Sequence, residues 1–280
     1  MLRVAVPNKG SLSEIAAEML AEAGYSGRRD SRKLVHRDER NDVEFFYLRP
    51  RDIATYVGSG ALDVGITGRD LLLDSGSGAY EIAELDFADS TFRFAAPAEG
   101  EISEIAHLAG KRVATSYPKL VDDFLRERGV EAETVKLDGA VESAVELGVA
   151  DAVADVVSTG ATLRAAGLEI FGPVILESTA LLIGGPSEHT EVGRLLRRLQ
   201  GVLVARKYAI LEYDLPLDRL EEASAIASGI ESPTVSPLNK EGWVAVRVMV
   251  RRDDANHVMD RLQDVGAKGI FVTQVHAARF

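Results

Sequence analysis

The sequence predicts an α/β protein that ends in a smaller α+β module. From residue 2 to residue 165, short apolar runs that suit strands alternate with segments of helical periodicity. This order is typical of a mostly parallel, doubly wound sheet. After residue 207 the order of strands and helices changes and resembles a ferredoxin-like β-α-β-β-α-β module. The length of 280 residues suits about two domains, at roughly 150 residues each.

The composition places the chain among soluble globular proteins, with 46% hydrophobic and 27% charged residues. It contains no cysteine, which excludes disulfides, thiolate metal sites and cysteine nucleophiles. The net charge of −12 argues against a nucleic-acid-binding surface, because such a surface requires clustered cations. An anionic ligand would therefore need local amide groups, a few arginines and Mg²⁺.

The chain also carries no signal that predicts export or membrane insertion. The apolar run within residues 1–7 is too short for a signal peptide. No run approaches the roughly 18 apolar residues that a membrane span needs. We therefore expect a cytoplasmic protein.

The first strand and helix place a lysine at a sheet edge. Residues 2–6 read as a strand and Pro7–Gly10 as a turn, and Ser11 opens a helix with Glu14 at capping-box spacing. Lys9 therefore stands where the carboxyl end of a strand meets a helix, which is the ligand-binding edge of open α/β sheets. A solvated lysine is the alternative reading of its position.

A second strand ends in two arginines. The segment 26–42 is highly charged and without clear period, and we expect it at the surface; residues 43–48 then form a strand. Arg49 and Arg51 follow, and the planar guanidinium group of arginine is well suited to bidentate hydrogen bonds with phosphate. Asp52 is expected to cap a short helix that ends near Val57.

The stretch 151–163 reads as a buried strand, the small polar turn Ser158–Gly160 and the start of a helix at Thr162. First-turn amide groups of a helix favour an anion, so this turn is a candidate phosphate site. Residues 61–71 repeat the pattern with a Thr-Gly turn, which suggests two lobes that present turns to one cleft. An ordinary strand-to-helix connection and a chance likeness are the alternatives.

The remaining elements follow the same alternation. We expect strands at 92–96, 112–115 and 134–137, and helices at 102–108, 119–128 and 138–148, the last capped by Asp138. Tyr117 lies in a strand-to-helix turn, again at the ligand edge. One or two strands within 174–183 and a helix at 187–200 suggest that the chain returns to the first lobe, which would make that lobe discontinuous.

The C-terminal module is expected to have strands at 208–213, 243–251 and 269–275, with helices at 217–227 and 255–265. The loop 229–237 is too rich in proline for a helix and too apolar for a plain linker. A pocket for a regulatory ligand and an ordered structural loop both explain it.

Several common kinds of site have no support. The histidines show no pair at metal-ligand spacing, and there is no G-x-S-x-G, G-x-G-x-x-G or P-loop signature. What remains are acids and arginines at strand ends, together with the turn after residue 157. That set suits the binding and positioning of phosphorylated substrates.

Six segments, taken together and in order, carry a family resemblance: residues 6–10, 48–50, 63–70, 154–163, 232–234 and 266–268. The chain resembles the long form of ATP phosphoribosyltransferase, the first enzyme of histidine biosynthesis, and is closest to the actinobacterial members. The short form lacks the terminal module. The competing classes are a two-lobed binding protein without catalysis and a catalytically silent regulatory subunit. The missing signal peptide and the histidine-biosynthesis segments argue against the binding protein, and the complete phosphate turn argues against the silent subunit.

The resemblance implies a fold and a domain organisation. It implies two lobes of type II periplasmic-binding-protein kind with the active site between them, followed by a ferredoxin-like regulatory domain. The lobes would comprise residues 1–90 with 176–206 and residues 91–175, and the regulatory domain residues 207–280. It also implies active dimers and inhibited hexamers of this chain.

The resemblance further implies a magnesium-dependent pentosyltransferase that joins ATP and phosphoribosyl pyrophosphate through N1 of the adenine ring. The implied catalytic residues are Lys9, Arg49 and Asp155. Carried over residue by residue, the phosphoribosyl pyrophosphate site would be formed by Asp155, Ser158, Thr159, Gly160, Ala161 and Thr162. The ATP site would be formed by Lys9, Gly10, Leu12, Arg49, Asp70 and Tyr117. Mg²⁺ would be held mainly by substrate phosphates. Ala154 precedes Asp155, so the paired acids of other phosphoribosyltransferases are not present here.

The family also implies feedback inhibition by L-histidine bound to the terminal module. The implied site residues are Asp214, Ile230, Ser232, Thr234 and Gly269. A neighbouring subunit could complete this pocket. The resemblance implies neither a nucleic-acid nor a membrane partner.

Overall fold

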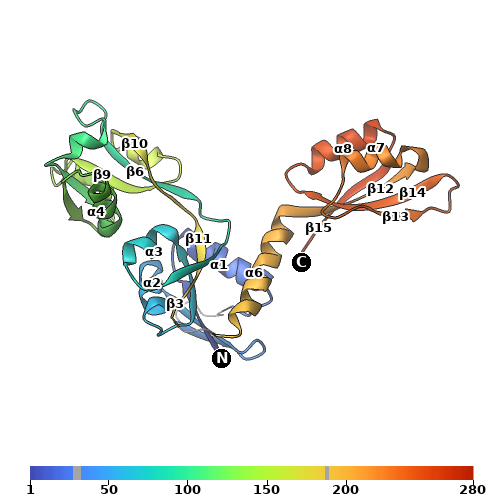
Figure 1. Ribbon diagram of the computed structural model, residues 1–280, viewed down its shortest axis with the longest axis horizontal. Helices are drawn as coiled ribbons and strands as arrows, with labels where there is room; N and C mark the ends of the chain where they lie inside the picture. The colour runs from blue at the N-terminus through green and yellow to red at the C-terminus, as the bar shows by residue number, and fades with distance from the viewer. Residues whose placement is uncertain (28–32, 187–188, 280) are drawn as a thin grey trace. The chain divides into compact units, whose positions relative to one another are not determined.

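A computed structural model describes residues 1–27, 33–186 and 189–279 of the chain. These residues divide into two compact units, Met1–Leu20 with Tyr25–Gly193, and Ala21–Gly24 with Arg194–Phe280. The first unit contains two mixed sheets and the second a third sheet (Figure 1). Among the described residues, no helix is long and apolar enough to cross a membrane.

The first sheet is built around the N-terminal strand. Its strands run in the order β2 (Val35–Asp38), β3 (Val43–Leu48), β1 (Leu2–Pro7), β4 (Val64–Gly68), β11 (Ala180–Gly184) and β5 (Tyr80–Glu84). β1 pairs in parallel with β3 and β4, and the other pairs are antiparallel. β1, β3 and β4 therefore deliver the residues after Pro7, Leu48 and Gly68 to one edge of the sheet.

Apolar side chains cover both faces of this sheet because successive residues of a strand point to opposite faces. On one face Ala5 packs with Ile53 and Val57 of α2 (Pro50–Gly58) and with Leu72 of α3 (Arg69–Ser75). On the other, Phe45 meets the ring of Tyr25 edge-on at 5.8 Å, just after α1 (Ser11–Glu22). We call the first sheet with α2 and α3 lobe I.

The second sheet has the order β10 (Leu168–Ser178), β6 (Ser90–Pro97), β9 (Ala152–Val157), β7 (Arg112–Thr115) and β8 (Glu133–Lys136). α4 (Pro118–Glu127) and the 3-10 turn η1 (Ile105–Leu108) pack on one face through Phe124 and Leu108. α5 (Ala161–Ala165) and the 3-10 turn η2 (Val141–Ala144) cover the other face. We call this sheet with α4 and α5 lobe II.

The chain crosses between the two sheets twice. It leaves the first sheet after β5 and enters the second at β6, then returns from β10 to β11, which lies between β4 and β5. The result is the two-lobed fold of type II periplasmic-binding-protein kind. The boundaries expected at residues 90 and 175 remain predictions.

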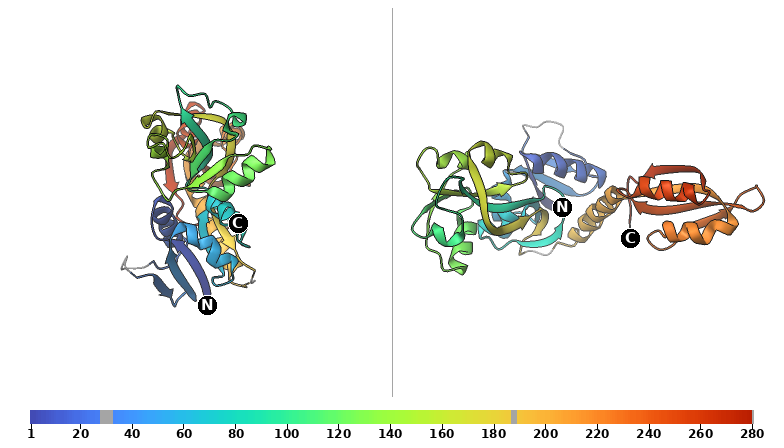
Figure 2. Two further views of the ribbon diagram at one scale, coloured as in Figure 1. Left: turned by 90° about the vertical axis from the view of Figure 1, so that its left-hand side faces the viewer. Right: turned by 90° about the horizontal axis from the view of Figure 1, so that it is seen from above.

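The second unit carries an antiparallel sheet in the order β13 (Thr234–Pro237), β14 (Trp243–Arg251), β12 (Tyr208–Pro216) and β15 (Lys268–Gln274). α7 (Leu220–Ile226) follows the 3-10 turn η3 (Leu217–Arg219), and with α8 (Ala255–Asp264) it lies on one face of this sheet (Figures 1 and 2). Alternate residues of β12 and β14, such as Leu211 and Val246, form the core beneath the helices. The chain enters this unit along α6 (Val192–Lys207), where Arg206 pairs with Glu22 at 2.8 Å. This order matches the predicted ferredoxin-like module.

Two segments expected to be irregular contain strands. The charged segment 26–42 includes β2, an edge strand of the first sheet, while residues 28–32 lie outside the described residues. The loop 229–237 includes β13, which pairs with β14. Pro237 is tolerated there because β13 is an edge strand. The helix expected at 187–200 is α6, which begins at Val192 and ends at Lys207; residues 187 and 188 are not described.

Three helix predictions were wrong in detail. Asp52 does not cap its helix: α2 begins at Pro50 with Arg49 at the N-cap, since proline suits the first helical position. Asp138 caps no helix either, because Ala140 adopts a left-handed φ of 50° and only the 3-10 turn η2 follows. The helix expected at 102–108 is reduced to the 3-10 turn η1.

Candidate active site

A cavity of about 450 Å³ opens at the carboxyl ends of β1 and β3. We call it the Lys9 cavity; it is lined by Lys9, Gly10, Ser11, Leu12, Arg49, Pro50, Arg51, Asp52, Leu71, Tyr117 and Asp138. Nine of these residues come from lobe I or from the start of α1, while Tyr117 and Asp138 come from lobe II. The structure therefore brings together five of the six residues predicted for ATP, all except Asp70.

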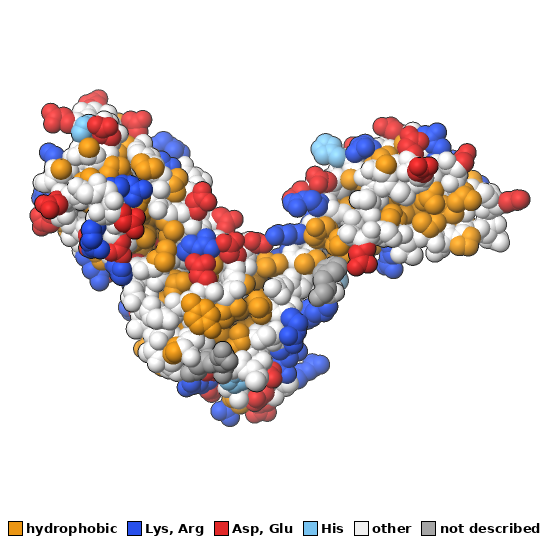
Figure 3. All heavy atoms as spheres, in the orientation of Figure 1, with side chains coloured by type: hydrophobic (Ala, Val, Ile, Leu, Met, Phe, Trp, Pro, Cys, Tyr) orange, Lys and Arg blue, Asp and Glu red, His pale blue; other side chains and the backbone are white. Residues whose placement is uncertain are grey.

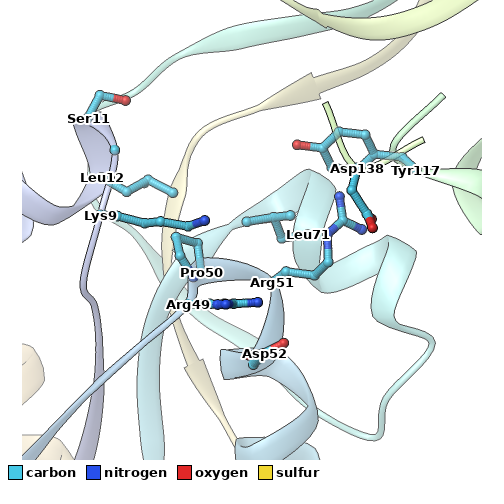
Figure 4. Close-up of a pocket in the computed structure, with 11 residues that line it drawn as sticks. Lys9, Ser11, Leu12, Arg49, Pro50, Arg51, Asp52, Leu71, Tyr117 and Asp138 are labelled. Carbon is cyan, nitrogen blue, oxygen red and sulfur yellow. The ribbon is translucent and has the colours of Figure 1, made fainter. Parts of the chain in front are cut away.

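Cationic side chains dominate the lobe I side of this cavity. Lys9 and Arg49 extend into the same space, with Tyr117 and Asp138 across from them (Figure 4). The guanidinium of Arg51 lies 4.9 Å from the centre of the Tyr117 ring. Three cations in one cavity of a chain with net charge −12 favour a polyanionic ligand. Over much of the face shown in Figure 3, Lys and Arg are interleaved with Asp and Glu, although a group of Lys and Arg gathers toward its lower edge.

A second cavity, of about 240 Å³, adjoins the first. We call it the Asp70 cavity, and its lining includes Gly68, Asp70, Val156, Ser158 and Ser178. Gly68 and Ser158 belong to the two turns that the sequence suggested would face each other, and they line this one cavity. The Asp70 and Lys9 cavities share four lining residues: Ser11, Leu12, Leu71 and Tyr117.

Tyr117 stands between the two cavities. Burial, followed by the nearby carboxylate of Asp70, raises the pKa of the Tyr117 hydroxyl well above its usual value. The ring also packs edge-on against Phe92, with centroids 5.1 Å apart. Tyr117 therefore stays a neutral hydrogen-bonding group with a fixed ring plane.

Asp155 lies near the end of β9 and is half-buried. Burial raises the pKa of its carboxyl, and the carboxylates of Glu142 and Asp70 act in the same direction. A hydrogen bond of 2.8 Å from the Val156 amide opposes this shift. The negative charge of Asp155 is thus poorly compensated by the protein alone, which suits a group that meets a cation.

The turn after β9 is shaped by its own backbone. Gly160 adopts a left-handed φ of 71°. The Arg164 side chain donates to the Thr159 carbonyl at 3.0 Å, and the Thr159 hydroxyl accepts from the Ala161 amide at 3.4 Å. Ser158, Thr159, Ala161 and Thr162 are exposed, so their polar groups are open to a ligand. α5 is only five residues long, so the backbone of the turn matters more here than any helix dipole.

The residues predicted for histidine fall into two places in the second unit. Ile230, Ser232 and Thr234 line a cavity of about 360 Å³ together with Arg247. Asp214 and Gly269 are not among its lining residues. They lie together where β12 pairs with β15: a side chain placed at Gly269 would have its Cβ 3.8 Å from the Asp214 carboxylate.

Sequence reasoning did not assign a site role to Arg51, Asp138, Asp74 or Ser178. The pair of arginines after β3 pointed to Arg51. Asp138 carried a signal that suggested a helix cap instead. Asp74 and Ser178 gave no local signal, since their partners lie at least 23 residues away in sequence. Within the part of the chain that the structure describes, no three His, Asp or Glu side chains are placed to hold a metal.

The chain is similar to known proteins over its full length. The family model described as "HisG: ATP phosphoribosyltransferase" matches residues 49–201, and the model described as "HisG, C-terminal domain" matches residues 205–277. ATP phosphoribosyltransferase from Paenarthrobacter aurescens is 60% identical, and that from Kocuria rhizophila 61%; each alignment covers 100% of both chains.

A solved structure is similar over most of the chain. A chain of the ATP phosphoribosyl transferase (HisG:HisZ) complex from Thermotoga maritima is 28% identical, with a TM-score of 0.62. The match covers 71% of this chain and 97% of that one.

Proposed function

This chain belongs to the ATP phosphoribosyltransferase family, in its long form, and we propose that the Lys9 and Asp70 cavities hold its two substrates side by side. The observation that carries this assignment is that the cavities share four lining residues. A transferase must bring a donor and an acceptor into contact, which two adjoining cavities allow. A protein that only binds one small ligand needs a single cavity.

ATP fits the Lys9 cavity. Lys9, Arg49 and Arg51 would bind its polyphosphate, because arginine forks match phosphate oxygens. Leu12 and Leu71 supply apolar surface for the adenine ring. Tyr117 would orient the base at the junction of the two cavities.

Phosphoribosyl pyrophosphate fits the Asp70 cavity and the adjoining turn. Residues 158–162 would hold its 5-phosphate through backbone amides and hydroxyls. This follows from the exposed polar groups of the turn and from the position of Ser158 in the lining. The reacting C1 of the ribose would then lie near the junction, where N1 of adenine can reach it.

The reaction is a displacement at carbon. The lone pair of adenine N1 forms a bond to C1 of the ribose, the bond from C1 to the pyrophosphate oxygen breaks, and pyrophosphate leaves with that electron pair. The nucleophile is a ring nitrogen and the leaving group is already good. Positioning and electrostatic stabilisation therefore matter more than a strong general base.

Asp155 would stabilise the positive charge that develops on the ribose. Its carboxylate is poorly compensated in the free protein, as its raised pKa indicates. A cationic sugar beside it gains interaction energy only as the reaction proceeds, which is the kind of interaction that accelerates a step. Binding of the ribose hydroxyls is the second role open to this side chain.

Magnesium fits this site as a substrate-bound ion. Mg²⁺ is usually bound through one or two carboxylates plus substrate phosphates, and Asp52, Asp70 and Asp138 line the two cavities. These carboxylates can complete the coordination of an ion that arrives with a polyphosphate. When bound, the ion would neutralise charge that grows on the departing pyrophosphate.

The terminal module would bind L-histidine as a feedback inhibitor. The 360 Å³ cavity beside Ser232 and Thr234, or the Asp214 and Gly269 position, offers polar groups for an amino acid. Assembly into an active dimer and an inhibited hexamer, and a location in the cytoplasm, complete the proposal.

A direct assay tests the activity. The protein is mixed with ATP, phosphoribosyl pyrophosphate and Mg²⁺, and the ultraviolet absorbance of the adenine product is followed. Arg49→Ala should lower kcat/KM on the order of a hundredfold, because one charge-stabilising group is lost. Lys136→Ala, which changes an exposed cation on β8, should have little effect. Absence of product at saturating substrates would refute the proposed function.

A further inference from the structure

Asp74 lies at the end of α3 in lobe I, and its partners lie in both lobes. Its Oδ2 accepts a hydrogen bond from Arg51 Nη1 at 2.9 Å. Its Oδ1 accepts hydrogen bonds from the backbone amides of Lys119 at 3.0 Å and Leu120 at 3.3 Å. The side chain is only 9% exposed, so solvent competes little for these bonds.

The two amides belong to the first turn of α4 in lobe II. The first amides of a helix have no partner within the helix and need an external acceptor. Pro118 has no N–H, so Lys119 and Leu120 are the first amides of α4 that can donate. The N-cap residue Tyr117 supplies no side-chain cap. Asp74 therefore caps a helix of the opposite lobe.

The same carboxylate fixes a group that lines the substrate cavity. Arg51 is held by Asp74 on one side and lies over the Tyr117 ring at 4.9 Å on the other. Both Arg51 and Tyr117 line the Lys9 cavity, whereas Asp74 does not. Tyr117 in turn immediately precedes α4, the helix that Asp74 caps.

The two lobes approach closely at this point. Gly76, at the end of α3, has a left-handed φ of 59°. A Cβ at Gly76 would lie 2.9 Å from Cε of Lys119. The backbone next to Asp74 is therefore packed against the Lys119 side chain of α4.

We propose that Asp74 is a positioning residue that couples lobe closure to the geometry of the nucleotide site. One carboxylate oxygen ties α4 and Tyr117 to lobe I, and the other aims Arg51 into the Lys9 cavity. The arrangement of the lobes described here and the binding geometry of Arg51 therefore form together. This inference rests on the proposed function only in taking the Lys9 cavity as the site of ATP.

The variant Asp74→Asn distinguishes the two roles of the carboxylate, which are capping α4 and pairing with Arg51. In Asp74→Asn, the amide oxygen can still accept from the α4 amides, but the amide nitrogen faces Arg51 and the ion pair is lost. Asp74→Ala loses both the cap of α4 and the ion pair with Arg51. Asp123→Asn is the matched control, because Asp123 lies on α4 itself and pairs with Lys119 and Arg126 at the surface.

Steady-state kinetics on the full-length variants, with thermal unfolding of each, tests the proposal. Asp74→Asn should keep the unfolding midpoint of the wild type and raise the KM for ATP about tenfold, with a smaller effect on phosphoribosyl pyrophosphate. Asp74→Ala should raise the same KM at least as much and also lower the midpoint. The double variant with Arg51→Ala should be no worse in KM than Arg51→Ala alone, because Asp74 acts on ATP through Arg51.

Small-angle X-ray scattering supplies the readout for closure. With both substrates present, the wild type and Asp123→Asn should contract, and Asp74→Ala should contract less. The proposal is overturned if folded Asp74→Asn and Asp74→Ala match Asp123→Asn in KM. It is also overturned if the effects of Asp74→Asn and Arg51→Ala on KM multiply. If the wild type shows no turnover, the assignment of the Lys9 cavity as the ATP site is refuted instead.

Discussion

The hydroxyl of Ser178 donates a hydrogen bond of 2.8 Å to the carboxylate of Asp70, and its oxygen accepts one of 3.1 Å from the Asp70 amide. Ser178 is the last residue of β10, and Asp70 belongs to the first turn of α3. Both are buried. The returning crossover strand is thus bonded to the residue that lines the Asp70 cavity, and this bond fixes the direction of that carboxylate.

Removal of this hydroxyl should be costly. Ser178→Ala removes one hydrogen-bond partner from the buried Asp70 carboxylate and one from the buried Asp70 amide, and we expect the free energy of unfolding to fall by about 1–3 kcal/mol. Urea denaturation measures the change. Ser59→Ala is the control: its hydroxyl bonds the Tyr56 carbonyl at the surface, so the change should stay within about 0.5 kcal/mol. Equal effects of the two substitutions would contradict the prediction.

Gly160→Val should weaken the binding of phosphoribosyl pyrophosphate. A Cβ at this position would lie 3.0 Å from Arg164 Nη1 and 3.3 Å from Ile170 Cδ1, in a turn proposed to hold a phosphate. We expect the KM for this substrate to rise at least tenfold while the KM for ATP changes little. Gly167→Val is a matched control, because Gly167 has the same φ of 71° but open space around it. An unchanged KM in Gly160→Val would show that the turn does not hold the phosphate.

Asp155→Asn should separate stability from activity. The pKa of Asp155 is raised in the folded protein, so its ionisation opposes folding. Relative to Asp155→Asn, the wild type is therefore most stable below the pKa that this carboxyl has in the unfolded chain. This relative stability is lost as pH rises through the raised pKa of the carboxyl in the folded protein. At pH 7 the variant should unfold at a higher temperature than the wild type, and the difference should disappear in acid. Its kcat should fall on the order of a hundredfold. A variant less stable than the wild type at pH 7 would contradict this account.

Histidine binding should be visible through Trp243, the single tryptophan of the chain. Lys268, which pairs with Asp214 across β12 and β15, has its ammonium 5.6 Å from the Trp243 ring. We expect L-histidine to change the tryptophan emission, and Asp214→Asn to weaken that response at least tenfold. Asp218→Asn changes an exposed acid in η3, just after the same strand, and should respond as the wild type does. A full response in Asp214→Asn would place the ligand elsewhere, beside Ser232 and Thr234.

Deletion of residues from 208 onward should abolish inhibition by histidine while activity remains measurable. The reason is that all five residues proposed for the inhibitor belong to the second unit. The absorbance assay, run with and without L-histidine, measures both properties. Inhibition that survives the deletion would show that the terminal module is not the regulatory domain.

The sequence by itself determined which residues stand at the ligand edge. Strand periodicity located the ends of β1 and β3, which meet at one edge of the first sheet, and the end of β9 in the second sheet. Lys9, Arg49 and Ser158 were found in this way. The small residues of the Thr-Gly turn and of Ser158–Gly160 indicated that a ligand can approach the backbone closely. The ferredoxin-like module followed from the order of its elements. Local patterns sufficed here because each depends on neighbours in the chain.

Only the tertiary structure decided which of these residues meet. The bonds of Asp74 to α4 and of Ser178 to Asp70 join segments 45 and 108 residues apart. No periodicity or capping rule connects them, because the partners belong to different lobes. Asp138 shows the same limit of local sequence patterns. It has the spacing of a helix cap, yet it lines the Lys9 cavity. The contents of a site between two lobes depend on how the chain crosses between them, and this is a property of the whole fold.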